Sequence, residues 1–129
     1  MSHILDTNFV IGLLRGVSSY WDYLERLVEE AVPTISVVTR SEIFAGCHPH
    51  EERATTNLLD RFETVSIYVS ISDLAGKYIY QFRKRGLTLH LEDSLIGATA
   101  VVEGLTLVTR NVDHFPMLTL GGNLIRFPD

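Results

Sequence analysis

Apolar and polar residues recur along the chain with two different periods, and these predict a series of strands and helices. Short apolar or β-branched runs predict strands at 3–5, 34–38, 65–68 and 105–108, with an edge strand near Leu118 or 124–127. Apolar residues three or four positions apart predict helices at 9–14, 18–31, 39–46, 51–62, 70–85 and 91–103. Strands that alternate with helices indicate βαβ units, so we expect an α/β fold with a mainly parallel sheet covered on both faces.

Residues at the expected helix ends carry capping signals. Ser18 or Ser19 is suited to cap the second helix, and Thr39-x-x-Glu42 and Ser70-x-x-Asp73 have the spacing of capping boxes. Gly86 and Gly104 follow the last turns of two helices, where a left-handed residue often ends the helix. These signals set the boundaries that we expect.

The length and composition of the chain limit its class. With 129 residues, 46% of them hydrophobic, residues 1–129 are expected to form a single domain. Cys47 is the one cysteine, which excludes an intramolecular disulfide and fits a reducing compartment. No signal peptide or membrane-length apolar run is evident, so we expect a cytoplasmic protein.

The net charge of −5 argues against nucleic-acid binding through a broad basic face. A protein of this charge that acts on a phosphodiester would need bound cations, which can be the largest local charges in a site. A basic protein partner would also suit it.

Acidic residues follow or precede the expected strands in a way that favours a metal site. Asp6 follows the first strand, Glu42 lies a helical turn after the second, Asp93 opens the helix before the last clear strand, and Asp113 follows that strand. Parallel strands bring such positions to one edge of the sheet, where ligands commonly bind. Converging carboxylates repel unless a cation lies between them, and Mg²⁺ binds carboxylates, waters and phosphate. This chemistry suits phosphodiester hydrolysis by a metal-activated water.

Each acid also has an ordinary structural explanation. Asp6 can cap the following helix, and Glu42 can complete a capping box with Thr39. Asp93 can interact with a helix dipole, and Asp113 can form a turn. The joint placement of four acids at one edge favours the metal site over these separate explanations.

Four segments of the chain resemble motifs of a known family. They are Ile4-Leu5-Asp6-Thr7-Asn8, Thr39-Arg40-Ser41-Glu42-Ile43, Glu92-Asp93-Ser94-Leu95-Ile96-Gly97-Ala98-Thr99-Ala100 and Leu107-Val108-Thr109-Arg110-Asn111-Val112-Asp113-His114-Phe115. Together they resemble a PIN domain, specifically the toxin of a VapBC-type toxin–antitoxin pair, over nearly the whole chain. The resemblance implies a three-layer α/β/α fold, an Mg²⁺- or Mn²⁺-dependent endoribonuclease, frequent dimerisation and a cognate antitoxin that blocks the active site.

The resemblance also assigns roles by position. Asp6, Glu42 and Asp93 match three catalytic acids, with Asp6 and Asp93 as metal ligands and Glu42 as a further candidate. Many relatives place a fourth acid where this chain has His114, so Asp113 and Asn111 remain the candidates for that role.

Neighbouring polar residues would support the acids. In this interpretation Thr7 and Asn8 hydrogen-bond a carboxylate or a metal-bound water, and Thr109 and Asn111 orient the ligands. Arg110 or Arg40 would contact phosphate, although an arginine on the surface is equally well explained as a solvated side chain.

Three other features have weaker functional interpretations. Cys47-His48-Pro49-His50 contains zinc-type ligands but lacks a second ligand pair at suitable spacing. Residues 83–85 are basic and would attract RNA or, as we favour, interact with the helix dipole. Residues 9–14 and the aromatic residues at 20–23 should be mostly core, and any exposed part would bind an antitoxin helix.

Two rival functions remain open at this stage. An aspartyl-nucleophile phosphatase would use Asp6, but phosphatases of the haloacid-dehalogenase type have a second aspartate two residues later, where this chain has Asn8. A PIN-like fold that binds RNA or protein without catalysis is the other alternative, and the three matching acids argue against it.

Overall fold

The structure is a computed structural model that describes residues 2–129 of the chain. Within these residues one five-stranded sheet is formed by β1 (His3–Leu5), β2 (Thr34–Ser36), β3 (Glu63–Val65), β4 (Thr106–Thr109) and β5 (Leu124–Arg126). The strand order is β3-β2-β1-β4-β5, and every neighbouring pair is parallel. The expected parallel sheet is therefore confirmed, including β5 as an edge strand.

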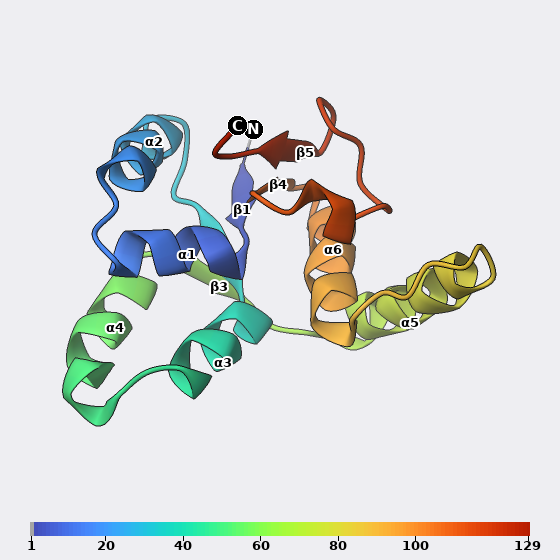
Figure 1. Ribbon diagram of the computed structural model, residues 1–129, viewed down its shortest axis with the longest axis horizontal. Coiled ribbons are helices and arrows are strands. Elements are labelled where there is room, and N and C mark those ends of the chain that lie inside the picture. The colour runs from blue at the N-terminus through green and yellow to red at the C-terminus, as the bar shows by residue number, and fades with distance from the viewer. Residues whose placement is uncertain (1) are drawn as a thin grey trace.

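Helices cover both faces of this sheet. They are α1 (Thr7–Leu14), α2 (Ser18–Val28), α3 (Val37–Ala45), α4 (Glu52–Leu59), α5 (Val69–Arg83) and α6 (Leu91–Glu103), with short 3₁₀ turns η1 (Pro49–Glu51) and η2 (Val112–His114). Figure 1 shows α1 and α2 on one side of the β1–β4 region and α6 and α5 on the other. The molecule thus has the three-layer α/β/α arrangement.

Alternate residues of the central strands point into two separate cores. Leu5 and Val108 pack with side chains of α1 to α4, whereas Ile4 and Leu107 pack with Ile96 and other residues of the α6 side. All five side chains are completely buried. This two-residue alternation is what a sheet with helices on both faces requires, and it holds the ends of β1 and β4 in fixed positions.

The last long helix agrees best with the sequence prediction. Helix α6 spans Leu91–Glu103 as expected, and Gly104 ends it with a φ of 65° in the left-handed region. Gly86 likewise has a φ of 82° just after α5. Both glycines therefore occupy backbone conformations that a residue with a Cβ adopts only at a cost.

The capping box predicted at Thr39 and Glu42 is wrong. Helix α3 begins two residues earlier, at Val37, and its N-cap is Ser36, whose Oγ accepts the N–H of Val38 at 3.0 Å. Because Ser36 caps the helix, strand β2 ends at residue 36, whereas the β-branched run predicted a strand to residue 38. Glu42 lies in the middle of the helix and is available for another role.

Three other local predictions also differ from the structure. Strand β3 spans 63–65 instead of 65–68; its first two residues are exposed at the sheet edge, so no apolar run marks it. The N-caps of α2 and α5 are Val17 and Tyr68, and neither Ser18 nor Ser70 forms the predicted cap. Among residues 2–129, no helix has the length and apolar character needed to cross a membrane.

Candidate active site

The ends of β1 and β4 bring Asp6 and Thr109 together although they are 103 residues apart in sequence. In the sheet, β2 and β3 lie on one side of β1, and β4 and β5 lie on the other. Parallel sheets commonly bind ligands at the strand where the order of strands reverses in this way. The Thr109 hydroxyl donates to Asp6 Oδ2 at 2.7 Å, and the N–H of Asn111 donates to Thr109 Oγ1 at 3.0 Å. Thr109 thus orients the Asp6 carboxylate.

Asp6 also caps helix α1. Its Oδ1 accepts the N–H of Thr7 at 2.8 Å, and the residue is only 5% exposed. Burial raises the pKa of Asp6, and the hydrogen bonds from Thr109 and Thr7 and the charge of His114 act in the opposite direction. Asp6 therefore caps a helix and also acts on the charge of Asp93, so its capping role does not exclude a role in the site.

Thr7 connects this carboxylate to Glu42. The Thr7 hydroxyl donates to Glu42 Oε1 at 2.7 Å and lies 3.0 Å from the Thr39 hydroxyl. Thr7 and Thr39 are buried, whereas Glu42 is exposed, so the threonines anchor α3 to the start of α1 and hold the Glu42 carboxylate beside the strand end. The prediction that Thr7 hydrogen-bonds a carboxylate is therefore confirmed, although the sequence did not identify Glu42, 35 residues away, as the partner.

Asp93 is the acid whose environment is most perturbed. It lies in the first turn of α6 with its side chain 19% exposed. Burial, together with the charges of Asp6, Glu92 and Glu42, raises its pKa to about 6, against the opposing charge of His114. A strong shift that combines burial with specific charge partners is typical of functional sites. The fold therefore brings Asp6, Glu42 and Asp93 into one electrostatic environment.

His114 is a member of this site that the sequence analysis treated only as the replacement of an acid. Its Nδ1 lies 3.5 Å from Asp93 Oδ2, and the imidazole, when protonated, lowers the pKa of both Asp93 and Asp6. Its side chain is 53% exposed. The motif that contains His114 was visible in the sequence, but its proximity to Asp93 required the fold.

The remaining candidates lie at or beyond the margin of the site. Asp113 is exposed on η2 and lines a small pocket with Asp93 and His114, yet it is not among the charges that raise the Asp93 pKa. Arg110 is exposed and Asn8 is half-buried. Arg40 Nη1 lies 3.3 Å from Asp60 Oδ1 on the surface.

The arrangement of the three acids is open. Within residues 2–129, no three Asp, Glu, His or Cys side chains form a complete set of ligands for one metal ion. Ions such as Mg²⁺ keep several waters and use only one or two carboxylates directly. Asp6, Glu42 and Asp93 offer oxygen ligands but do not by themselves enclose an ion.

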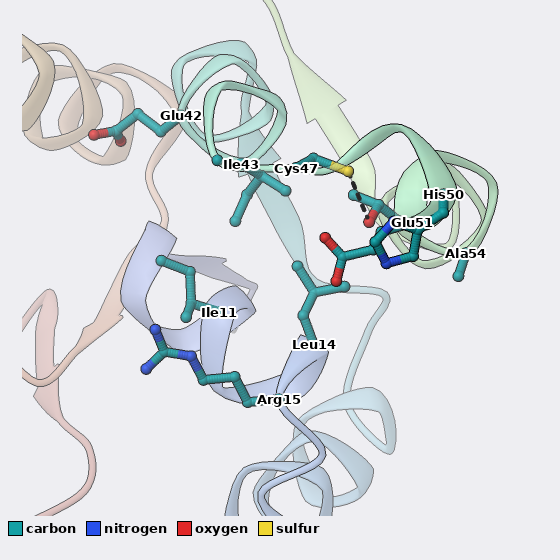
Figure 2. Close-up of a pocket in the computed structure, with 11 residues that line it drawn as sticks. Ile11, Leu14, Arg15, Glu42, Ile43, Cys47, His50, Glu51 and Ala54 are labelled. Atoms are coloured by element: carbon teal, nitrogen blue, oxygen red, sulfur yellow. Dashed lines mark hydrogen bonds between the residues drawn. The ribbon is translucent and has the colours of Figure 1, made fainter.

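A groove of about 520 Å³ begins next to Glu42. Figure 2 shows Ile11 and Leu14 of α1 on one side and Ile43 of α3 on the other, with Glu51 also facing the groove. The expectation that the aromatic residues at 20–23 are mostly core is confirmed for Tyr20, which is 7% exposed and packs against Phe9. On α1, the apolar side chains that reach the surface are Ile11 and Leu14, and both line this groove.

Comparison with known proteins assigns the chain to a family. The family model described as PIN domain matches residues 3–117. The chain belongs to the PIN-domain family. Ribonuclease VapC10 of Mycobacterium tuberculosis is 35% identical to this PIN domain over 114 residues, which cover 88% of this chain and 86% of the relative. The similarity identifies a PIN domain of the VapC type.

Solved structures of similar proteins support the fold. A toxin–antitoxin complex from Klebsiella pneumoniae contains a chain with a TM-score of 0.77 and 28% identity, covering 95% of each chain. VapBC2 from Rickettsia felis, bound to a DNA fragment from its promoter, has a TM-score of 0.81 at 22% identity and covers 98% of each chain. Nearly all of this PIN domain therefore follows the architecture of these proteins.

Proposed function

We propose that this PIN domain is a divalent-metal-dependent endoribonuclease that acts as the toxin of a toxin–antitoxin pair. The observation that carries the proposal is the shared environment of the three acids, in which Asp6 and Glu42 both raise the pKa of Asp93. The 35% identity to a VapC ribonuclease supplies the reaction class. RNA is the proposed substrate, and the cytoplasm is the proposed compartment.

The residues at the site fit Mg²⁺ or Mn²⁺. All three acids offer oxygen ligands, and a cation would relieve both the burial penalty and the mutual repulsion of Asp6 and Asp93. Asp6 and Asp93 would hold the ion, with Glu42 as a further candidate ligand. When bound, such a cation lowers the pKa of a water ligand and offsets charge that develops on the phosphate.

The other residues of the site orient the carboxylates. Thr109 and the N–H of Thr7 occupy one lone pair on each oxygen of Asp6, which leaves its remaining lone pairs facing the site in a fixed direction. The Thr7 hydroxyl holds Glu42 in the same way. His114 places an imidazole beside Asp93, where it can donate a hydrogen bond to substrate phosphate. Asn8, Arg110 and Asn111 remain proposed contacts to water or phosphate.

An antitoxin is the proposed protein partner. The similar solved structures are complexes of toxin and antitoxin. In this chain, the groove between α1 and α3 presents Ile11, Leu14 and Ile43 and reaches Glu42, so a helix bound there would extend to the acids. A cognate antitoxin should copurify and inhibit cleavage, and Leu14→Lys should weaken both effects. A homodimer is also part of the proposal and is measurable by light scattering.

The central test is RNA cleavage by the purified protein freed from any antitoxin. Structured RNA should be cut internally with Mg²⁺ or Mn²⁺, and chelator or Asp6→Asn should abolish the cleavage. Asp22→Asn is a suitable control because Asp22 is an exposed carboxylate on α2. Cleavage that persists in chelator and in Asp6→Asn would contradict the proposal.

The same preparation distinguishes the rival functions. A phosphatase with Asp6 as nucleophile would form a phosphate adduct at that residue, detectable by mass spectrometry. No such adduct is expected, because this chain has Asn8 where phosphatases of that type have a second aspartate. A non-catalytic module would bind RNA without cutting it under every metal condition.

A further inference from the structure

A small pocket has Asp93 in its wall and extends away from Asp6 and Glu42, neither of which lines it. It has a volume of about 200 Å³ and is lined by the α5–α6 loop at 87–90 and by Asp93, Asp113, His114 and Pro116. We call it the Asp113 pocket. Its volume exceeds the roughly 30 Å³ of a water and is below the roughly 300 Å³ at which drug-sized ligand sites begin. It therefore suits one small ring system.

The lining of the Asp113 pocket has the mixed character that a nucleobase requires. Leu87, Leu89 and Pro116 offer apolar surface to the faces of a ring, and His114 adds an imidazole. Single-stranded RNA bases commonly stack on aromatic and histidine side chains while their polar edges form hydrogen bonds. Asp113 and Thr88 supply polar groups for such an edge.

The two carboxylates in the pocket are not equivalent. Asp93 is 19% exposed and has His114 3.5 Å away, whereas Asp113 is exposed. Within residues 2–129, no side chain forms a hydrogen bond or an ion pair with the Asp113 carboxylate. Both of its oxygens are therefore available to a ligand.

An ionised carboxylate accepts hydrogen bonds and donates none. Its two oxygens are best satisfied by two adjacent donors on the partner. On the Watson–Crick edge, guanine presents N1–H and the N2 amino group side by side, while each of the other bases presents one donor next to an acceptor. The chemistry of the pocket therefore selects guanine among the four bases.

We propose that the Asp113 pocket binds the guanine base of the nucleotide next to the scissile phosphate, with Asp113 as the specificity-determining residue. The inference rests on the proposed ribonuclease function, because Asp93 in the pocket wall places the base next to the site of phosphate chemistry. It assigns Asp113 to the substrate base and leaves the metal to the other acids.

Nucleotide binding tests the pocket without any cleavage. Guanosine, adenosine, cytidine and uridine 5′-monophosphates are titrated into the wild-type protein and into Asp113→Asn, with calorimetry or ligand-observed NMR as the readout. The wild type should prefer the guanine nucleotide by about 5- to 150-fold, the range of one bidentate base contact. Asp113→Asn should lose this preference because asparagine offers only one acceptor to the two guanine donors. Asp22→Asn should behave as the wild type.

A cleavage experiment with a randomised RNA supplies the second readout. The wild type should cut next to guanine, and Asp113→Asn should cut with relaxed sequence preference in the same metal. A preference that is absent in the wild type, or unchanged in Asp113→Asn, would overturn the inference. Uniform loss of cleavage at all sequences together with weaker Mn²⁺ binding would also overturn it, because Asp113 would then be a metal ligand. Guanine-selective binding without any RNA cleavage would instead overturn the ribonuclease and retain the pocket.

Discussion

The two halves of the molecule contribute to the candidate site in different ways. The half built from β1, α1 and α3 holds Asp6 with a hydrogen bond to each oxygen and fixes Glu42 through Thr7. The half built from α6 and η2 presents Asp93, whose nearest described partner is the exposed His114 at 3.5 Å. Burial raises the pKa of both aspartates, but only Asp6 has neutral hydrogen-bond donors that oppose the effect.

This difference indicates which half is complete without a ligand. Hydrogen bonds within the protein stabilise Asp6 as a carboxylate, whereas Asp93 depends on an external positive charge or on a proton. We infer that the first half forms a rigid frame and that the second half gains most from a bound cation. The following predictions test this contrast, from the largest expected effect to the smallest.

Asp6→Asn should reduce metal-dependent RNA cleavage by about 100-fold or more, since changes even to groups that only orient metal ligands cost about 10- to 100-fold. Asparagine keeps one oxygen to accept the N–H of Thr7, and its NH2 group can donate to the Thr109 hydroxyl oxygen, so the variant should remain folded. Initial rates with the metal in excess measure the loss. An unchanged rate in a folded variant would show that Asp6 has only its capping role.

Asp93→Asn should increase the stability of the metal-free protein at pH 7 by up to about 3 kcal/mol, the equivalent of the shift to about 6. Because the folded-state pKa is raised, the Asp93 contribution favours folding below about pH 4 and is lost as the pH rises through about 6. The variant should lack this pH dependence. It should also show a smaller increase in Tm with Mn²⁺. Urea unfolding at several pH values is the measurement, and a marked loss of metal-free stability would instead favour a role of Asp93 in the helix dipole alone.

Thr109→Val should destabilise the protein by about 2 kcal/mol, because a buried Asp6 oxygen loses its donor. The matched control is Thr99→Val in α6, where an equally buried hydroxyl donates to the backbone carbonyl of Leu95 at 2.7 Å. The Leu95 carbonyl lies within helix α6, so removing the Thr99 hydroxyl should lower the free energy of unfolding by less than removing the Thr109 hydroxyl. Metal affinity should not change in Thr99→Val. Equal effects of the two variants on metal affinity would argue that Thr109 has no special role.

Gly12→Ala should cost about 1 kcal/mol, because a Cβ at Gly12 would lie 2.6 Å from the Tyr20 ring and overpack the contact of α1 with α2. Gly76→Ala is the matched change in the other half. No atom lies within 4 Å of a Cβ at Gly76 in α5, so the gain in helix propensity should stabilise the protein by about 0.5 to 1 kcal/mol. Thermal unfolding of both variants measures the contrast. If both variants changed Tm in the same direction, the surroundings of Gly12 would be no more tightly packed than those of Gly76.

The features predicted best from sequence are those with a strong local cause. Helix α6 combines a regular apolar pattern with Gly104, whose left-handed conformation ends it. The parallel sheet followed from the alternation of strands and helices. The acids at strand ends were recognisable because a parallel sheet places such positions at one edge, and the resemblance to PIN domains agreed with them.

The features that were missed depend on competition or on long-range contacts. Ser36 and Thr39 are both residue types that cap helices, and the sequence alone does not show which one caps α3. In the structure Ser36 is the cap, because its Oγ accepts the N–H of Val38. The pairing of Thr7 with Glu42 joins residues 35 positions apart, and His114 meets Asp93 only through the packing of η2 against the sheet end. A single sequence contains no local signal for contacts of this kind.

The hydrogen bond between Thr109 and Asp6 has a consequence for synthesis on the ribosome. Its partners are separated by 103 residues, and β4 lies between β1 and β5 in the sheet. A nascent chain that has not yet released β4 has an unpaired β1 and an Asp6 without its donor. The potential to cut RNA should therefore arise abruptly and late in translation, which would spare the translating ribosome from a partly made toxin.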